Sequence, residues 1–102
     1  MNMDIQTTDI SIKLNEKNYH DMLFMYTWVI IQAFVDYANK SSNKRILKVR
    51  KNAEEWIMKD NEGFFEVCEI VSIAPEKVRA KFLQLKNAEC DLAEVINSIK
   101  GF

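Results

Sequence analysis

Glycine and proline are scarce in this chain, with two glycines and one proline among 102 residues. Tight β-hairpins need glycine where φ is positive, and phosphate-cradling loops need several glycines together, so little material remains for either. Lys, Glu, Leu, Ile and Ala are abundant instead, which indicates an all-α fold. A chain of this length forms one domain around a single core and has little room for a large active-site cleft.

Residues that carry catalytic or metal chemistry are also few. The only histidine is His20, and the two cysteines, Cys68 and Cys90, have no second Cys or His at ligand spacing. No catalytic triad, CxxC, HExxH or EF-hand pattern occurs. The sequence therefore predicts no enzyme, no metal site and no cofactor. The cysteines are expected to be free thiols in a reducing compartment, the cytoplasm.

Signals for secretion or membrane insertion are missing as well. The first residues lack a basic segment followed by an apolar one. The longest apolar run, residues 22–35, would span roughly 21 Å as a helix, against the ~30 Å of a hydrocarbon layer. It also contains Thr27 and Gln32. We expect a buried core helix and no membrane contact.

Hydrophobic spacing predicts five helices, at about residues 18–39, 44–59, 64–71 and 75–86, and a last one that opens at Asp91. Ser41, Ser42 or Asn43 would cap the second helix, and Asp91 with Glu94 resembles a capping box. Residues 1–17 are polar with a weak alternation at 9–14, which predicts a flexible, strand-like or disordered N-terminal arm. Residues 18–102 form the single helical domain.

The first helix is apolar on all sides. Twelve of the fourteen residues at 22–35 are apolar, and aromatic residues such as Phe24, Trp28 and Trp56 are spaced like core residues. Such a helix needs cover on nearly every side. Either it is the central helix of the domain, or part of its surface meets a second copy, and we expect a homodimer.

Positive charge gathers in one segment, although the net charge is −1. Residues 40–51 hold six bases and no acid. This segment suits contact with phosphates, which releases counterions, and Lys44, Arg45 and Lys48 are the expected contacts. A solvated helix face explains the same pattern, and both interpretations stay open.

Residues 65–83 have the spacing of a helix-turn-helix. Val67 and Val71 would lie on the buried side of its first helix, with Cys68 where the two helices approach closely. Pro75 suits the first position of the second helix. Ser72 stands where such turns usually have a glycine with positive φ. An ordinary αα-hairpin that serves packing alone remains the alternative.

The second helix of this motif separates apolar from polar positions. Val78, Phe82 and Leu85 share one face. The opposite face would meet a DNA major groove, where Lys77, Lys81 and Gln84 would contact bases. Arg79 lies at the flank and would contact phosphates. Partners in this interpretation are double-stranded DNA and a second copy of the chain.

From about Ala53 to Leu85, a third of the sequence, the chain resembles small, mostly uncharacterised helical proteins carried by bacteriophages and prophages. The shared positions are Glu55-Trp56-Ile57, Asp60, Phe65, Val67-Cys68, Ser72-Ile73 and Pro75-Glu76-Lys77-Val78-Arg79. Those proteins usually have Gly-Leu/Ile-Asp-Pro at the turn, so the Asp that would cap the following helix is missing here. The resemblance implies a regulatory helix-turn-helix module of a mobile genetic element.

The resulting hypothesis is a DNA-binding transcription regulator of phage or prophage origin. A homodimer would present two reading helices about one DNA turn apart. A protein-binding inhibitor or adaptor that acts on a host protein is the first alternative. A structural or assembly protein of a phage particle is the second.

Overall fold

The computed structural model describes the backbone of residues 2–101 and the side chains of residues 20–101. The chain forms the helices α1 (Asn2–Ala38), α2 (Lys44–Lys59), α3 (Gly63–Ile70), α4 (Pro75–Lys86) and α5 (Leu92–Gly101). No strand occurs within residues 2–101. The predicted all-α fold with five helices is confirmed.

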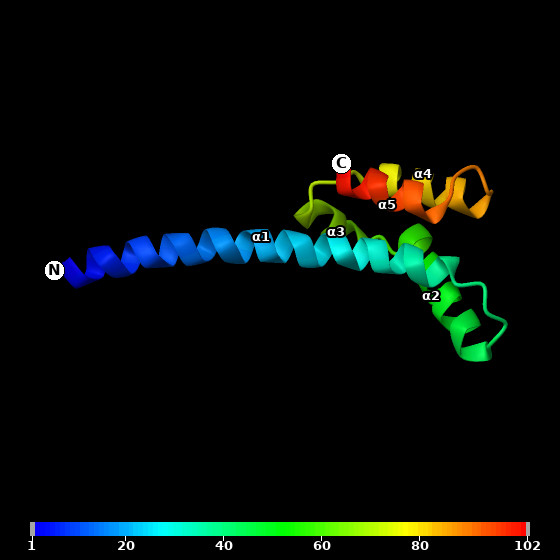
Figure 1. Ribbon diagram of the computed structural model, residues 1–102, viewed down its shortest axis with the longest axis horizontal. Coiled ribbons are helices and arrows are strands. Elements are labelled where there is room, and N and C mark those ends of the chain that lie inside the picture. Colours follow the sequence, from blue (N-terminus) through cyan, green and yellow to red (C-terminus); the bar gives the residue numbers. More distant parts are fainter. Residues whose placement is uncertain (1, 102) are drawn as a thin grey trace.

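Helix α1 begins earlier than the sequence predicted. It starts at Asn2 and not near residue 18, so the alternation at residues 9–14 wrongly indicated a strand-like arm. The physical reason is that no glycine or proline precedes Gly63, so nothing in the first segment stops a helix. Figure 1 shows this N-terminal part of α1 extending away from the other four helices, as an arm does.

The core lies around the C-terminal half of α1. Ile30, Ile31 and Phe34 of α1 are almost completely buried. Figure 1 shows α3, α4 and α5 on one side of this half and α2 crossing it on another. The remaining buried side chains come from α1 itself, from these four helices and from the turn before α4: Ala33, Ala53, Ile57, Phe64, Cys68, Ile73, Val78, Phe82, Val95 and Ile99. This half of α1 is therefore the central helix that the sequence predicted.

Aromatic contacts join α1 to α4 inside this core. The Phe82 ring lies 5.9 Å from the Phe34 ring and 4.5 Å from the Tyr37 ring, measured between centroids. The Tyr37 contact is edge-on, the arrangement that the quadrupoles of two rings favour. These contacts fix the phase of α4, and so decide which of its residues face solvent.

Two helices begin with the side-chain caps that the sequence predicted. The Asn43 side chain accepts a hydrogen bond from the Arg45 amide at 2.8 Å, at the start of α2. Asp91 accepts one from the Glu94 amide at 2.8 Å, at the start of α5. Helix α4 has Ala74 at its cap and no side-chain hydrogen bond there, so Pro75 alone preorganises its first turn.

Two turns place a residue other than glycine at positive φ. Ser72 has φ 59° after α3, and Ala88 has φ 58° after α4. After α3, the Ile73 amide donates to the Cys68 carbonyl at 3.0 Å, and the Ser72 amide donates to Glu69 at 3.1 Å. This pair of bonds is the Schellman motif, which satisfies the last carbonyls of a helix. The turn before α4 thus has the backbone that glycine usually supplies, with serine in its place.

The buried face of α3 differs from the prediction by a rotation of the helix. Phe64 and Cys68 are fully buried, whereas Val67 and Val71 are partly buried and pack at the edge of the core. Phe64 fills this position because its ring stacks edge-on against Trp56 of α2, with 5.1 Å between centroids. Cys68 is fully buried, and the close approach of the two helices at this residue stays a prediction.

Candidate binding surfaces

Four bases share the exposed face of the first turns of α2. Lys44, Arg45, Lys48 and Lys51 are all exposed, and no acid occurs in α2 before Glu54. Positions 44, 48 and 51 are spaced by one turn each, so their side chains form a stripe. The N-terminus of a helix carries partial positive charge, which adds to this field. We call these four residues the basic stripe.

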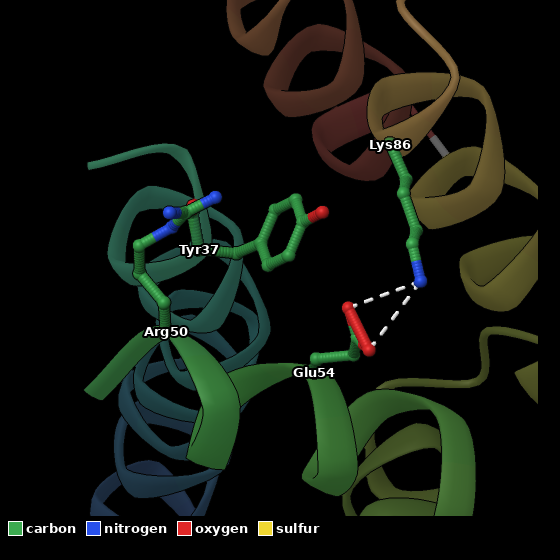
Figure 2. A network of polar contacts seen from close by, with 4 residues as sticks. All are labelled: Tyr37, Arg50, Glu54 and Lys86. Atoms are coloured by element: carbon green, nitrogen blue, oxygen red, sulfur yellow. Dashed lines mark hydrogen bonds and ion pairs between the residues drawn. The ribbon is translucent and has the colours of Figure 1, made fainter. Parts of the chain in front are cut away.

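Arg50, the remaining base in this part of α2, points toward α1. Its Nε donates to the Tyr37 carbonyl oxygen at 2.9 Å, and its guanidinium lies 5.3 Å from the centre of the Tyr37 ring. Figure 2 shows Arg50 lying against the end of α1. Tyr37 is one of the last residues of α1, whose carbonyls lack partners within the helix. Arg50 therefore caps α1 and is not part of the basic stripe.

The exposed face of α4 carries almost no net charge. Glu76, Lys77, Ala80 and Leu83 are exposed, and Leu83 retains 43% of its surface. Two of the residues predicted to contact bases, Lys81 and Gln84, are half-buried at the sides of this face. Of the three predicted readers, Lys77 is the one that is exposed. This surface offers one base, one acid and an apolar side chain.

Arg79, predicted to contact phosphates, lies against the end of α2. Its Nε donates to the Ile57 carbonyl at 2.7 Å, and its Nη2 donates to the Asp60 carbonyl at 3.2 Å and to Asn61 Oδ1 at 3.1 Å. The guanidinium also lies 5.2 Å and 4.9 Å from the centres of the Phe64 and Phe65 rings. Arg79 thus caps α2 and holds α4 against α2 and α3.

Asp60 lies at the same junction and binds backbone amides at the start of α3. Its Oδ1 accepts hydrogen bonds from the Glu62 amide at 2.8 Å and the Phe64 amide at 3.4 Å, at the start of α3. These amide bonds, with a smaller contribution from the Arg79 charge, lower the pKa of Asp60 below its usual value. Asp60 therefore marks the start of α3.

The last base of α4 also contacts α2. Lys86 Nζ lies 3.3 Å from Glu54 Oε1 across the two helices, a pair that Figure 2 shows with dashed lines. Both side chains keep a large exposed fraction, so the pair is a surface salt bridge of small energy. The pair directs the Lys86 ammonium group toward Glu54 of α2.

The predicted DNA-contacting residues fall into separate groups. Lys44, Arg45 and Lys48 lie on the N-terminal turns of α2, which Figure 1 shows pointing away from α4 and α5. Lys77, Lys81 and Gln84 lie on α4. Arg79 faces neither group, because its guanidinium is directed into the junction of α2 and α3. The fold thus brings three of the bases together on α2 and places the α4 residues elsewhere.

A large apolar surface remains exposed on α1. Phe24 is 74% exposed, Met25 65%, Trp28 49%, Val29 43% and Met22 37%. We call these five residues the apolar face of α1. Phe24 and Trp28 were predicted to be core residues, and this was wrong, because the other helices cover mainly the C-terminal half of α1. The sequence signal was present, since a helix that is apolar on all sides needs more cover than four short helices provide.

A groove runs beside this face, between α1 and α2. Its volume is about 510 Å³. Trp28 and Trp56 border it, and Ala33, Val49 and Ala53 are among the apolar residues that line it. Gln32, Asp36 and Asn52 supply the polar groups. The lining of the groove is therefore mostly apolar.

Burial raises the pKa of both thiols. Burial raises the pKa of Cys68 to about 11, so its unreactive thiol form dominates at neutral pH. Cys90 is half-buried and burial raises its pKa as well, while His20 is exposed. Among residues 20–101, no group of His, Cys, Asp and Glu side chains is placed to hold a metal ion.

The segments that the structure describes include no helix with the length and apolarity needed to cross a membrane. No family model, no curated protein and no solved structure matches the chain. The resemblance to phage proteins therefore stays a prediction.

Proposed function

We propose that the protein is a small DNA-binding regulator of phage or prophage origin that acts in the cytoplasm. The observation that carries this proposal is the basic stripe on α2. Its four side chains are exposed on one face, near the positive end of a helix, with no carboxylate among them. Electrostatic contact with phosphates supplies most of the affinity in non-specific DNA binding, even for a protein whose net charge is near zero.

The α3–α4 hairpin supports the same proposal. Its turn has positive φ at Ser72, and α4 presents an exposed face after it. Lys77, Ala80 and Gln84 are side chains that suit contacts to base edges in a major groove. In this proposal, Lys44, Arg45 and Lys48 hold the backbone of DNA, and α4 adds a modest sequence preference through Lys77, Lys81 and Gln84. Arg79 positions α4 and contacts no phosphate.

A salt titration tests the phosphate contacts. The affinity for a labelled duplex is measured by fluorescence anisotropy from about 50 mM salt upward, and four phosphate contacts predict a log–log slope near −3.6. The triple variant K44Q/R45Q/K48Q should reduce that slope by about 2.7. K100Q, which removes an exposed base from the end of α5, is the matched control and should change it little. Absence of binding at the lowest salt would refute the proposal.

Selection from a mixed DNA library tests the role of α4. The variants K77A, K81A and Q84A should weaken the preference for the selected sequence while they leave the salt slope nearly unchanged. An unaltered preference in all three variants would remove α4 from the interface.

A neighbouring integrase or repressor gene would support regulation, and neighbouring capsid genes would support phage assembly.

A protein-binding inhibitor or adaptor is the second candidate, and one observation favours it. The exposed face of α4 combines Leu83 with Glu76 and Lys77, a mixed composition that suits a protein surface better than a polyanion. In that case L83A should abolish partner binding, and the charge variants of α2 should have little effect. Neither function assigns a catalytic step to the chain.

A further inference from the structure

We infer that a second copy of this chain covers the apolar face of α1, and that the two α1 helices pair antiparallel about a two-fold axis near Trp28. This inference does not depend on DNA binding. It rests on the exposure of the apolar face, on the groove beside it, and on the way in which the two are arranged along one helix.

The apolar face is too large to be ordinary surface. Phe24 and Met25 keep 74% and 65% of their surface, and Trp28 keeps about half. With about 200 Å² for a fully exposed large side chain, the five residues expose roughly 540 Å². A patch of this size on a soluble protein marks an interaction site.

The face and the groove complement each other on the same helix. Phe24 and Met25 project about one turn before Trp28, and the groove is lined by Gln32 and Ala33, about one turn after it. An antiparallel two-fold through Trp28 places position 24 of one helix opposite position 32 of the other. Each copy then inserts its projecting side chains into the groove of the other, which is the reciprocity that a two-fold interface requires.

The area is sufficient for a stable pair. Two copies of the apolar face together remove roughly 1,080 Å² from water, before any polar rim is counted. A specific interface needs about 1,000 Å² or more, so the pair lies at the small end of stable dimers. The central Trp28 is the type of residue that carries binding energy in such interfaces.

The charges around the face disfavour a membrane as the occupant. Residues 20–38 contain no Lys or Arg, and the acids Asp21 and Asp36 flank the apolar residues. Anionic lipid surfaces attract helices whose polar border is basic. In the antiparallel pair, residue 36 of one copy is level with residue 20 of the other along the helix axis.

The first experiment measures mass against concentration for the full chain. Analytical ultracentrifugation should give a monomer–dimer equilibrium, with dimer dominant at about 100 μM. W28A and F24E should each weaken the dimer at least tenfold. Both positions are exposed, so circular dichroism should remain that of the wild type. L83A removes an exposed apolar residue from α4, and this control should dimerise normally.

The second experiment tests the orientation. In a C90S background, H20C and D36C chains are prepared separately, mixed and treated with a short bis-maleimide. The antiparallel pair brings residues 20 and 36 of different copies together, so the mixture should form a covalent dimer. Each chain alone should not, because two residues 20 lie about 24 Å apart along the paired helices.

Three results would overturn the inference. The wild type stays monomeric at the highest concentration, or W28A and F24E dimerise as the wild type does, or H20C crosslinks efficiently with itself. In the first case, the apolar face belongs to a different protein, and DNA binding by the basic stripe is untouched.

Discussion

Helices α2 and α4 carry bases at similar density, and they use them differently. On α2, Lys44, Arg45, Lys48 and Lys51 all face solvent. On α4, Arg79 is hydrogen-bonded to the end of α2, and Lys86 pairs with Glu54. Apart from Arg50, which caps α1, the bases at the start of α2 thus form a charged surface, whereas two bases of α4 tie that helix to α2.

This difference teaches that the phase of a helix decides the role of its charges. The core fixes the phase of α4 through Val78 and Phe82, which leaves Arg79 about 100° from the middle of the exposed face. A long guanidinium at that angle reaches the carbonyls at the end of a neighbouring helix. Counting charges in a segment therefore overestimates a binding surface wherever such carbonyls are close.

The largest effect is expected for Arg79. The R79A variant removes three hydrogen bonds and two ring contacts and leaves the Ile57 and Asp60 carbonyls without their guanidinium partner, so it should lower the free energy of unfolding by about 2–3 kcal/mol. Urea denaturation measures this change. R79K should restore only part of it, because an ammonium lacks the planar fork of the guanidinium. K48A on α2 is the control and should stay within about 0.5 kcal/mol of the wild type.

The turn between α3 and α4 offers a stabilising change that leaves every charge in place. Ser72 has φ 59°, which costs serine more than glycine, so S72G should raise the free energy of unfolding by about 0.5–1 kcal/mol. Thermal denaturation checks the sign. S98G is the matched control, since Ser98 lies within α5 and its replacement should destabilise. A lower free energy of unfolding for S72G would show that the Ser72 side chain stabilises the turn by more than its positive φ costs.

Asp60, at the start of α3, should make the free energy of unfolding depend on pH in the acidic range. Amide hydrogen bonds, that of Glu62 first, lower the pKa of Asp60. Its contribution is therefore complete above the carboxyl pKa of the unfolded chain, about 3.9, and is lost as the pH falls through the lower folded value. D60N should flatten the fall of the melting temperature between about pH 5 and pH 2. An unchanged profile would assign the acid sensitivity to other carboxylates.

The smallest effect is expected for the surface pair of α2 and α4. E54Q breaks the ion pair with Lys86, and both side chains are substantially exposed, so the change should stay below about 0.5 kcal/mol. The residual effect should vanish at high salt. A loss comparable to that of R79A would contradict the distinction between the two bases of α4.

Local pattern predicted most of the fold. Helices α2 and α4 have the predicted bounds because Asn43 and Pro75 mark their starts, and Asp91 opens α5 in the same way. The start of α1 was missed because a short alternation of apolar residues is weaker than the absence of glycine and proline from the first segment. Local sequence signals predict a helix boundary where a capping residue is present, and they miss the boundary where a helix continues without one.

The roles of the site residues depended on contacts between distant segments. Arg79 meets carbonyl groups 19 and 22 residues earlier in the chain, and Arg50 meets one 13 residues earlier. No spacing rule within one helix indicates such partners. The basic stripe was predictable, since it needs only one helix and the position of the core. The sequence indicated that the apolar first helix needs more cover than four short helices provide. It did not indicate that Phe24 would stay exposed, because that depends on how far the other helices reach along α1.

Both tryptophans of the chain border the groove between α1 and α2. Trp28 is half exposed to water, whereas Trp56 lies edge-on against the buried ring of Phe64. Two intrinsic fluorophores therefore border the same groove, and the surroundings of Trp28 are more polar than those of Trp56. Any molecule that fills the groove should shift the emission of Trp28 toward the blue, so occupancy can be followed in the unlabelled chain.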